Sequence, residues 1–425
     1  MHPLRRVHQG KDSTRGEPIR TFAPELLRIP MAMHRGDPAA PRVEAGERVK
    51  LGQVIGAAVG PLGLPVHASA SGTVRFVGPY VEIENDFRDD WAALFPLGDA
   101  ETCPPEAVAA AVRDAGVCGM GGAAFPTFAK LDARGKRCDA VLINGAECET
   151  HRTCDHRLMV ERADRVADGL RIAMRALGAA RGVVAIEDDK PDAVEAMRGA
   201  AAGRAGVEVV ALQTKYPQGS EKQLIFTVTG REVPSGGLPL DAGAVVLNAA
   251  TACAIADAVI EGKPLIERVV TVAGCVRHPS NLLARVGTRV SDLIAACGGF
   301  SVPESEVGRI LLGGAMTGAA VADADAPIGK ADGAVVVEDL RACRTSAETP
   351  CIRCGRCAAV CPMRLEPWRL LPLCRAGDAD RAVRAGLMDC IRCGCCSYVC
   401  PARLRLTPAF GDMQLRAARR GRRSS

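Results

Sequence analysis

The chain carries one cysteine motif twice, as Cys351-Ile-Arg-Cys354-Gly-Arg-Cys357-Ala-Ala-Val-Cys361-Pro362 and as Cys390-Ile-Arg-Cys393-Gly-Cys-Cys396-Ser-Tyr-Val-Cys400-Pro401. Both runs have the form C-x₂-C-x₂-C-x₃-C-P, the spacing with which paired [4Fe–4S] clusters are bound. The runs begin about 39 residues apart, which leaves room for one intervening helix. The repeat predicts a small helical domain built around two clusters and an ability to move single electrons.

In this motif the fourth cysteine leaves its own loop and binds the other cluster. The spacing therefore predicts a crossed arrangement of two ligand sets: Cys351, Cys354 and Cys357 with Cys400, and Cys390, Cys393 and Cys396 with Cys361. Cys395 is an extra thiol in the second run, either a spectator or a competitor of Cys396. Structural zinc is the alternative, but zinc usually joins two short knuckles through four ligands in total, and here two complete runs are present.

Composition excludes several classes of protein. The net charge of +5 and the aromatic content of 3% argue against a nucleic-acid partner. No apolar stretch is long enough to span a membrane, and no secretory signal is evident. The remaining cysteines form no framework pattern, which favours a reducing cytoplasm. The basic tail over residues 416–423 favours a solvated, disordered segment, with attraction to an anionic membrane surface as the alternative.

The pattern of strands, helices and turns predicts a multidomain α/β protein with four parts. Residues 1–100 contain short glycine-bounded strands and resemble the barrel-sandwich hybrid of biotinyl and lipoyl carriers. No lysine lies between Lys50 and Lys130, so this part is expected to be structural. Residues 101–265 alternate strands (139–143, 182–186, 207–212, 244–248) with helices (104–115, 156–177, 249–261), as in a Rossmann-like sheet. Residues 266–342 suggest a β-grasp domain, and residues 343–425 contain the cysteine runs.

A second candidate site lies in the Rossmann-like part. The loop Gly116-Val-Cys-Gly119-Met-Gly121-Gly122-Ala-Ala-Phe125-Pro-Thr-Phe-Ala-Lys130 could gather backbone N–H groups and one lysine around a phosphate. It matches neither a Walker loop nor G-x-G-x-x-G, and a plain tight turn is the alternative. Polar groups follow three predicted strands, as Asn144-Gly-Ala-Glu147-Cys-Glu149, as Tyr216-Pro-Gln-Gly219-Ser-Glu221 and as Asn248. Strand carboxyl ends are where open α/β sheets bind ligands.

These motifs resemble the flavin and NADH site of the flavoprotein subunit of respiratory complex I. From its first strands to its cysteine runs, the chain resembles the RnfC family, the C subunits of the Rnf complex, which is a ferredoxin:NAD⁺ oxidoreductase. The middle domain would then be of the complex I flavoprotein type and the β-grasp domain SLBB-like, followed by a ferredoxin-like domain. The resemblance implies FMN on Gly119, Gly121, Gly122, Lys130, Asn144, Glu147, Gly219 and Asn248, with Tyr216 as a further contact. It implies NAD(H) near Phe125, Glu149 and Glu221, the two glutamates being the catalytic candidates. Ala124 stands where the family usually has glycine.

The resemblance also implies a function. Electrons would pass between ferredoxin and NAD(H) through two [4Fe–4S] clusters and FMN, because a flavin exchanges both hydrides and single electrons. Ion translocation would need integral membrane and flavin-bearing partner subunits, with this chain peripheral on the cytoplasmic face of the bacterial membrane and ferredoxin an indirect partner. Two alternatives stay open: a soluble cobalamin reductase of a bacterial microcompartment, and an electron-conducting scaffold that does not bind NAD.

Overall fold

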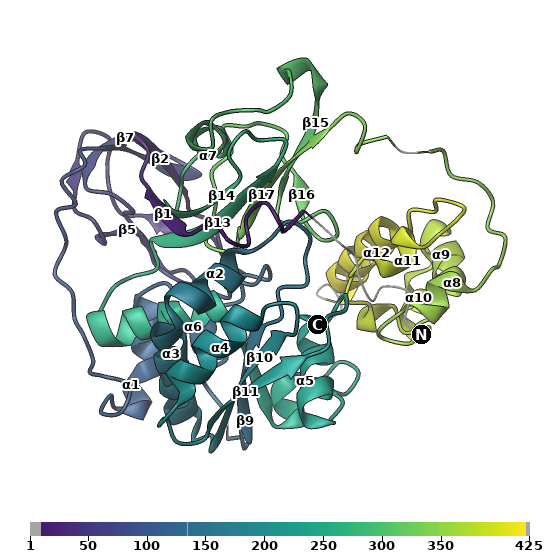
Figure 1. Cartoon of the computed structure of the whole chain (residues 1–425), viewed down its shortest axis with the longest axis horizontal. Coiled ribbons are helices and arrows are strands. Elements are labelled where there is room, and N and C mark those ends of the chain that lie inside the picture. Colours follow the sequence, from purple (N-terminus) through teal and green to yellow (C-terminus); the bar gives the residue numbers. More distant parts are fainter. Residues whose placement is uncertain (1–9, 134, 345, 422–425) are drawn as a thin grey trace.

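The computed structural model describes residues 10–133, 135–344 and 346–421. It contains four sheets and, at one end of the molecule, a helical module that an extended segment connects to the rest (Figure 1). The order of elements along the chain is β1 to β8, then alternating helices and strands up to β17, then helices only.

The N-terminal part contains two small antiparallel sheets, β2-β8-β7-β4 and β3-β5-β6. Their core consists of alternate side chains such as Leu27, Ile29, Val81 and Ile83, which are fully buried because successive residues of a strand point to opposite faces. The strands are β2 (Leu26–Pro30), β3 (Ala40–Pro41), β4 (Arg48–Val49), β5 (Val54–Ala57), β6 (Val66–His67), β7 (Gly72–Val77) and β8 (Tyr80–Asn85).

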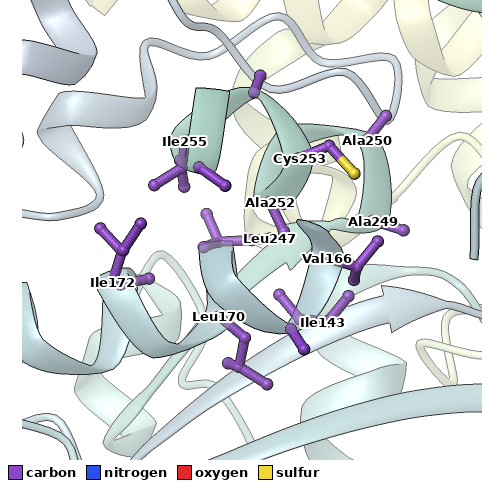
Figure 2. Packing of buried hydrophobic residues seen from close by; sticks show 14 of the residues in the cluster. Ile143, Val166, Leu170, Ile172, Leu247, Ala249, Ala250, Ala252, Cys253 and Ile255 are labelled. Atoms are coloured by element: carbon purple, nitrogen blue, oxygen red, sulfur yellow. The ribbon is translucent and has the colours of Figure 1, made fainter. Parts of the chain in front are cut away.

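The central part is a parallel sheet in the order β11-β10-β9-β12. Ile143 and Leu247 face helices α3 and α6, whereas Leu142 and Val246 face α5. The small-residue α6 packs closely on α3 (Figure 2). A Cβ on Gly169 of α3 would clash with the carbonyl oxygen of Ala252. The elements are α1 (Pro105–Asp114), β9 (Ala140–Gly145), α2 (Cys154–Glu161), α3 (Ala163–Leu177), β10 (Arg181–Glu187), α4 (Pro191–Ala201), β11 (Val207–Leu212), α5 (Glu221–Thr229), β12 (Ala244–Asn248) and α6 (Ala249–Ala256).

Two predicted helices differ from the structure. The helix expected over 156–177 is two helices, because Arg162 leaves the helical region (φ −132°, ψ 37°). Both helices pack on α4 and α6, but the break lets α2 also contact β13 and β1 while α3 contacts α1. The helix expected over 249–261 is α6 followed by a π-helical turn over Asp257–Glu261, which ends at Gly262 in the left-handed conformation.

The third part is a mixed sheet in the order β1-β14-β13-β17-β15-β16. Its first strand comes from the N-terminal segment, because β1 pairs in parallel with β14 from Ile19↔Asn281 to Phe22↔Ala284. This strand therefore lies in a different sheet from the rest of the first hundred residues. The elements are β1 (Ile19–Phe22), β13 (Glu267–Gly274), β14 (Ser280–Arg285), α7 (Val290–Ala296), β15 (Val307–Leu312), β16 (Ala319–Ala320) and β17 (Ala334–Asp339).

The C-terminal module consists of helices packed around Leu370, Leu387, Leu406 and Phe410. Its helices are α8 (Arg356–Ala359), α9 (Pro367–Arg375), α10 (Ala379–Arg384), α11 (Cys395–Tyr398) and α12 (Leu406–Gly421). Helix α12 includes most of the segment predicted to be a solvated, disordered tail. Residues 416–420 are largely exposed, as predicted, but they are helical and not disordered, and residues 422 and 423 lie outside the described part.

Candidate functional site

The central sheet has a topological switch point between β9 and β12. The connections after β9 and β10 contribute α3 and α4 to one face, whereas α5, which leads to β12, covers the other face. Asn144 and Asn248 end these neighbouring strands and are register partners. Since ligands of open α/β sheets bind at such a point, the two asparagines mark the candidate site, as expected from the sequence.

Both asparagine side chains are hydrogen-bonded to protein. Asn144 Nδ2 donates to the carbonyl oxygen of Gly219 at 2.7 Å, which ties the loop after β11 to β9. Asn248 Oδ1 accepts from the amide of Ala250 at 3.0 Å and so caps α6, while its Nδ2 donates to Asp155 at 2.7 Å. The asparagines therefore join the loops that surround the strand ends.

The glycine loop lies beside the N-terminus of α6. Its ends are held by the amide of Gly119, which donates to the carbonyl oxygen of Phe125 at 2.8 Å, and by the amide of Met120, which donates to Thr251 Oγ1 at 2.9 Å. Gly121 lies so close to Asn248 that a Cβ would be 3.3 Å from the Asn248 Cβ. Gly121 and Gly122 are exposed next to a helix N-terminus, an arrangement that can bind an anion.

Two loop residues have backbone conformations that favour glycine. Gly122 has φ +116°, and Ala124 has φ +49°. An alanine in the left-handed region costs about 1–2 kcal/mol. Ala124 is thus a strained position in the loop, and its carbonyl oxygen accepts from the amide of Arg35 in the N-terminal part at 2.9 Å.

Lys130 and Glu221 form an ion pair across the strand ends. Lys130 Nζ lies 2.7 Å from Glu221 Oε1 and donates to the carbonyl oxygen of Val246 on β12 at 3.0 Å. The side chains predicted to contact FMN and NAD(H), respectively, are therefore neighbours. Both are partly exposed.

Glu147 is held inside the protein. Its carboxylate accepts from the amides of Asp155 at 2.8 Å and His156 at 3.0 Å at the start of α2, and Arg152 Nε lies 3.4 Å away. Burial opposes ionisation of Glu147, but the charges of Lys11 and Arg152 outweigh it and hold the pKa of Glu147 below its usual value. Its side chain fixes α2 relative to β9.

Glu149 contacts the third sheet. Its carboxylate accepts from the amide of Met316 at 3.0 Å and from the hydroxyl of Thr317, both in the turn between β15 and β16. The amide of Thr150 also donates to it at 3.1 Å. Glu149 therefore lies where the central and third parts meet, at the edge of the candidate site.

Tyr216 reaches the cysteine-rich module. Its hydroxyl donates to the carbonyl oxygen of Cys393 at 2.7 Å. Its ring belongs to a buried cluster that also contains Val360 and Cys395, with Cys148 and Met316 packed against it. This cluster connects the loops at the strand ends to the second cysteine run.

The structure gathers the cysteines in the crossed arrangement. One cavity of about 510 Å³ is lined by Cys351, Cys354, Cys357 and Cys400. A second, much smaller cavity of about 20 Å³ is lined by Cys361, Cys390, Cys393 and Cys396. Four thiols around one space fit the donor set of a [4Fe–4S] cluster. The buried Cys395 also lines the second cavity, and a hydrogen bond with it is the main cause that lowers the pKa of Cys393 to about 7.

Two buried cations that the sequence did not predict also hold the glycine loop. Lys330 Nζ donates to the carbonyl oxygen of Gly116 at 2.7 Å, and burial lowers the pKa of Lys330 to about 8. Arg268 donates to the carbonyl oxygen of Lys330 at 2.8 Å and approaches that of Met120 at 3.5 Å. The sequence signal that could have indicated Arg268 is its position as a single cation at the start of the apolar strand β13.

Family models match three parts of the chain. The RnfC barrel sandwich hybrid domain matches residues 6–88, the Nuo51 FMN-binding domain residues 112–257 and the SLBB domain residues 269–320. An air-oxidized NAD⁺-reducing [NiFe]-hydrogenase shares the fold, with a TM-score of 0.51 and 22% identity over 75% of this chain and 58% of that one. The predicted fold class is confirmed. Fold and site define an oxidoreductase subunit with a flavin-type α/β domain and a cysteine-rich helical domain.

Similar proteins narrow this class. The C subunit of the Na⁺-translocating ferredoxin:NAD⁺ oxidoreductase complex of Acetobacterium woodii is 40% identical over 86% of this chain and 85% of its own length. The C subunit of the proton-translocating ferredoxin:NAD⁺ oxidoreductase complex of Clostridium ljungdahlii is 41% identical over 86% of this chain and 82% of its own length. The C subunit of the ion-translocating oxidoreductase complex of Rhodobacter capsulatus is 43% identical over 86% of this chain and 73% of its own length. The chain therefore belongs to the family of C subunits of ion-translocating ferredoxin:NAD⁺ oxidoreductase complexes, as the motifs predicted.

Proposed function

We propose that this chain is the NAD(H)-reacting subunit of such a complex and that it holds FMN and two [4Fe–4S] clusters. Bound FMN would supply the chemistry that connects hydride exchange with nicotinamide to one-electron exchange with clusters. Ferredoxin would be the other redox partner, reached through further subunits. This function is preferred to that of a cobalamin reductase because the similar proteins named above are C subunits of these complexes.

The order of the sites along the molecule carries the proposal. Asn144 at the switch point binds the loop that contains Gly219, and Tyr216 of the same loop binds the carbonyl of Cys393. The second set of four thiols therefore adjoins the flavin-type domain, and the first set lies farther out in the helical module. A flavin and two clusters placed in this order would form one continuous row.

Each part of the site has a proposed task. The exposed amides around Gly121 and Gly122, the N-terminus of α6 and Lys130 would bind the FMN phosphate. Asn144, Gly219 and Asn248 would shape the flavin pocket. Glu147 would hold the start of α2 in place beside it, through the amides of Asp155 and His156. Phe125, Glu149 and Glu221 at the rim would contact NAD(H).

Family membership supports a proposal for the partners and the location. We propose that the chain is peripheral, on the cytoplasmic face of the membrane, and meets integral membrane and flavin-bearing subunits that perform ion translocation. Within residues 10–133, 135–344 and 346–421, no helix is long and apolar enough to cross a bilayer.

The proposal is tested by composition and reduction of the anaerobically reconstituted chain. It predicts eight irons, from two cubane clusters, and one FMN per chain. NADH should bleach the flavin and then the clusters. Stoichiometric zinc, about four irons, or flavin that NADH does not reduce would contradict it, and the last result would favour a scaffold that does not bind NAD.

A further inference from the structure

The N-terminal segment over residues 10–22 is held between the flavin-type domain and the third sheet. Thr14 is fully buried, and its carbonyl oxygen accepts from Asn281 Nδ2 on β14 at 2.8 Å. The hydroxyl of Thr14 accepts from the hydroxyl of Thr153, just before α2, at 2.8 Å. The segment then continues as β1, which pairs with β14. Contacts on both sides therefore fix the position of its backbone.

This segment brings Lys11 to the carboxyl ends of β9 and β10. Lys11 Nζ donates to the carbonyl oxygen of Glu147, in the loop after β9. Burial lowers the pKa of Lys11, and the charge of Lys190 lowers it further, although the charges of Glu147 and Glu187 act in the opposite direction. An ammonium that gives up water in this way needs partners to compensate for the lost solvation.

Lys11 has fewer partners than its buried neighbour Lys190. Lys190 Nζ lies 3.0 Å from Glu187 and 2.6 Å from Asp189. Lys11 forms no ion pair within the described part of the chain, and only one of the three N–H donors of its ammonium has an acceptor there. The carboxylate of Glu147 instead accepts from two amides of α2. The remaining donors and the charge of Lys11 are therefore available to a bound group.

The loop that Lys11 contacts joins two residues assigned above to the flavin pocket. It follows Asn144, whose side chain donates to the carbonyl oxygen of Gly219 at 2.7 Å, and Cys148 Sγ accepts from the amide of the same Gly219 at 3.4 Å. Glu147 has φ +44°, a left-handed backbone that a residue with a side chain adopts only at a cost. The hydrogen bond from Lys11 therefore stabilises a strained residue at the edge of this pocket.

We propose that Lys11 is a positioning residue of the flavin site, which holds the loop after β9 and places a positive charge near the flavin ring. The inference rests on the proposed function for the presence of FMN. Charges near the ring tune the electronics of a flavin, and reduced flavin can carry a negative charge on its ring. Lys11 would therefore stabilise reduced FMN more than oxidised FMN and raise the midpoint potential of the bound flavin.

The midpoint potential of FMN in the reconstituted full chain tests the proposal. Lys11→Met removes the charge, and we expect it to weaken the binding of reduced FMN on the order of tenfold more than that of oxidised FMN. For a two-electron couple, a tenfold change in this ratio lowers the midpoint potential by about 30 mV. Lys11→Gln, which keeps an N–H donor, should shift the potential in the same direction. Lys11→Arg keeps the charge and should retain most of the wild-type potential.

Two further variants separate charge near the flavin from other effects. Thr14→Val loses the hydroxyl contact with Thr153 but keeps Lys11, so it should lower the melting temperature and leave the midpoint potential unchanged. Lys50→Met removes a positive charge from an exposed residue of the N-terminal part and should also leave the potential unchanged. An equal shift in either control would overturn the proposal.

Flavin and iron content of every variant complete the test. Loss of FMN from both neutral Lys11 variants but not from Lys11→Arg, with iron content unchanged, would also support the proposal. Neutral variants that bind FMN with the wild-type affinity and midpoint potential would overturn the role of Lys11 alone. A wild-type chain that binds no FMN would overturn the proposed function.

Discussion

Tyr216 and Cys393 are joined across the boundary between the flavin-type domain and the cysteine-rich module, through a 2.7 Å hydrogen bond from the tyrosine hydroxyl to the cysteine carbonyl. The tyrosine is 5% exposed and its ring packs on Val360 and Cys395. The contact fixes the second cysteine run relative to the strand ends.

Tyr216→Phe should keep the packing and lose the hydrogen bond, which costs about 1 kcal/mol. We expect a lower melting temperature of the reconstituted protein and slower reduction of the clusters by NADH in stopped flow. Tyr398→Phe is the control, since Tyr398 is 57% exposed. Identical behaviour of the two variants would show that the contact is unimportant.

The hydroxyl of Thr317 donates a hydrogen bond to the carboxylate of Glu149. Changing each partner in turn distinguishes a role of Glu149 in binding NADH from a role in holding the two parts together. Glu149→Gln and Thr317→Val should both weaken the contact between the central and third parts and lower the melting temperature. If Glu149 also contacts NADH, only its variant should raise KM, since losing a charge-assisted hydrogen bond costs about 1.5–3 kcal/mol. Equal KM values for the two variants would limit Glu149 to the interface.

Gly121→Val should abolish FMN binding. The new side chain would start 3.3 Å from the Cβ of Asn248 and would project over the loop amides. Gly199→Val is a matched control, because no atom other than those of its chain neighbours and of the adjacent backbone of α4 lies within 4 Å of a Cβ at that position. The measurement is flavin content per chain, and a Gly121 variant with full flavin and full iron would refute the assignment of the loop.

Lys330 makes stability depend on pH in a predictable direction. Its folded pKa of about 8 lies below the ordinary lysine value of 10.5, so between these pH values the unfolded chain binds more protons than the folded one. The penalty for burying the ammonium is complete below pH 8 and disappears toward pH 10.5.

Lys330→Met should therefore be most favourable, relative to wild type, at neutral pH, and this advantage should shrink as pH rises through that window. Thermal unfolding at pH 7 and pH 10 measures the difference, with the exposed Lys50→Met as control. A difference in melting temperature that is constant with pH would contradict a shifted Lys330.

The sequence predicted the features that depend on local pattern. The strands that end at Asn144 and Asn248 alternate with helices, and this pattern implied a parallel sheet whose carboxyl ends gather those residues. The crossed pairing of Cys361 and Cys400 was implied by motif spacing, and the two cavities have these linings.

Other features depend on contacts between distant segments. The NADH contact predicted for Glu149 stays a prediction. The sequence did not indicate that its carboxylate also accepts from a turn more than 160 residues away along the chain. Lys330 and Arg268 approach the glycine loop from the third part. A lone cation at the start of the apolar strand β13 was the one local signal for Arg268, and no local pattern indicates Lys330. The break at Arg162 lets α2 reach β13 of the third part while α3 packs on α1, and helical periodicity alone does not record such contacts.

The central claim is that the second thiol set, which adjoins the flavin-type domain, includes Cys361 from the first run. The most direct test is the EPR spectrum of the reduced Cys361→Ser variant, with Cys354→Ser and Cys393→Ser as references for the two sets. The account predicts that Cys361→Ser perturbs the same signal as Cys393→Ser and leaves the signal affected by Cys354→Ser intact. A spectrum that matches Cys354→Ser instead would contradict the crossed arrangement.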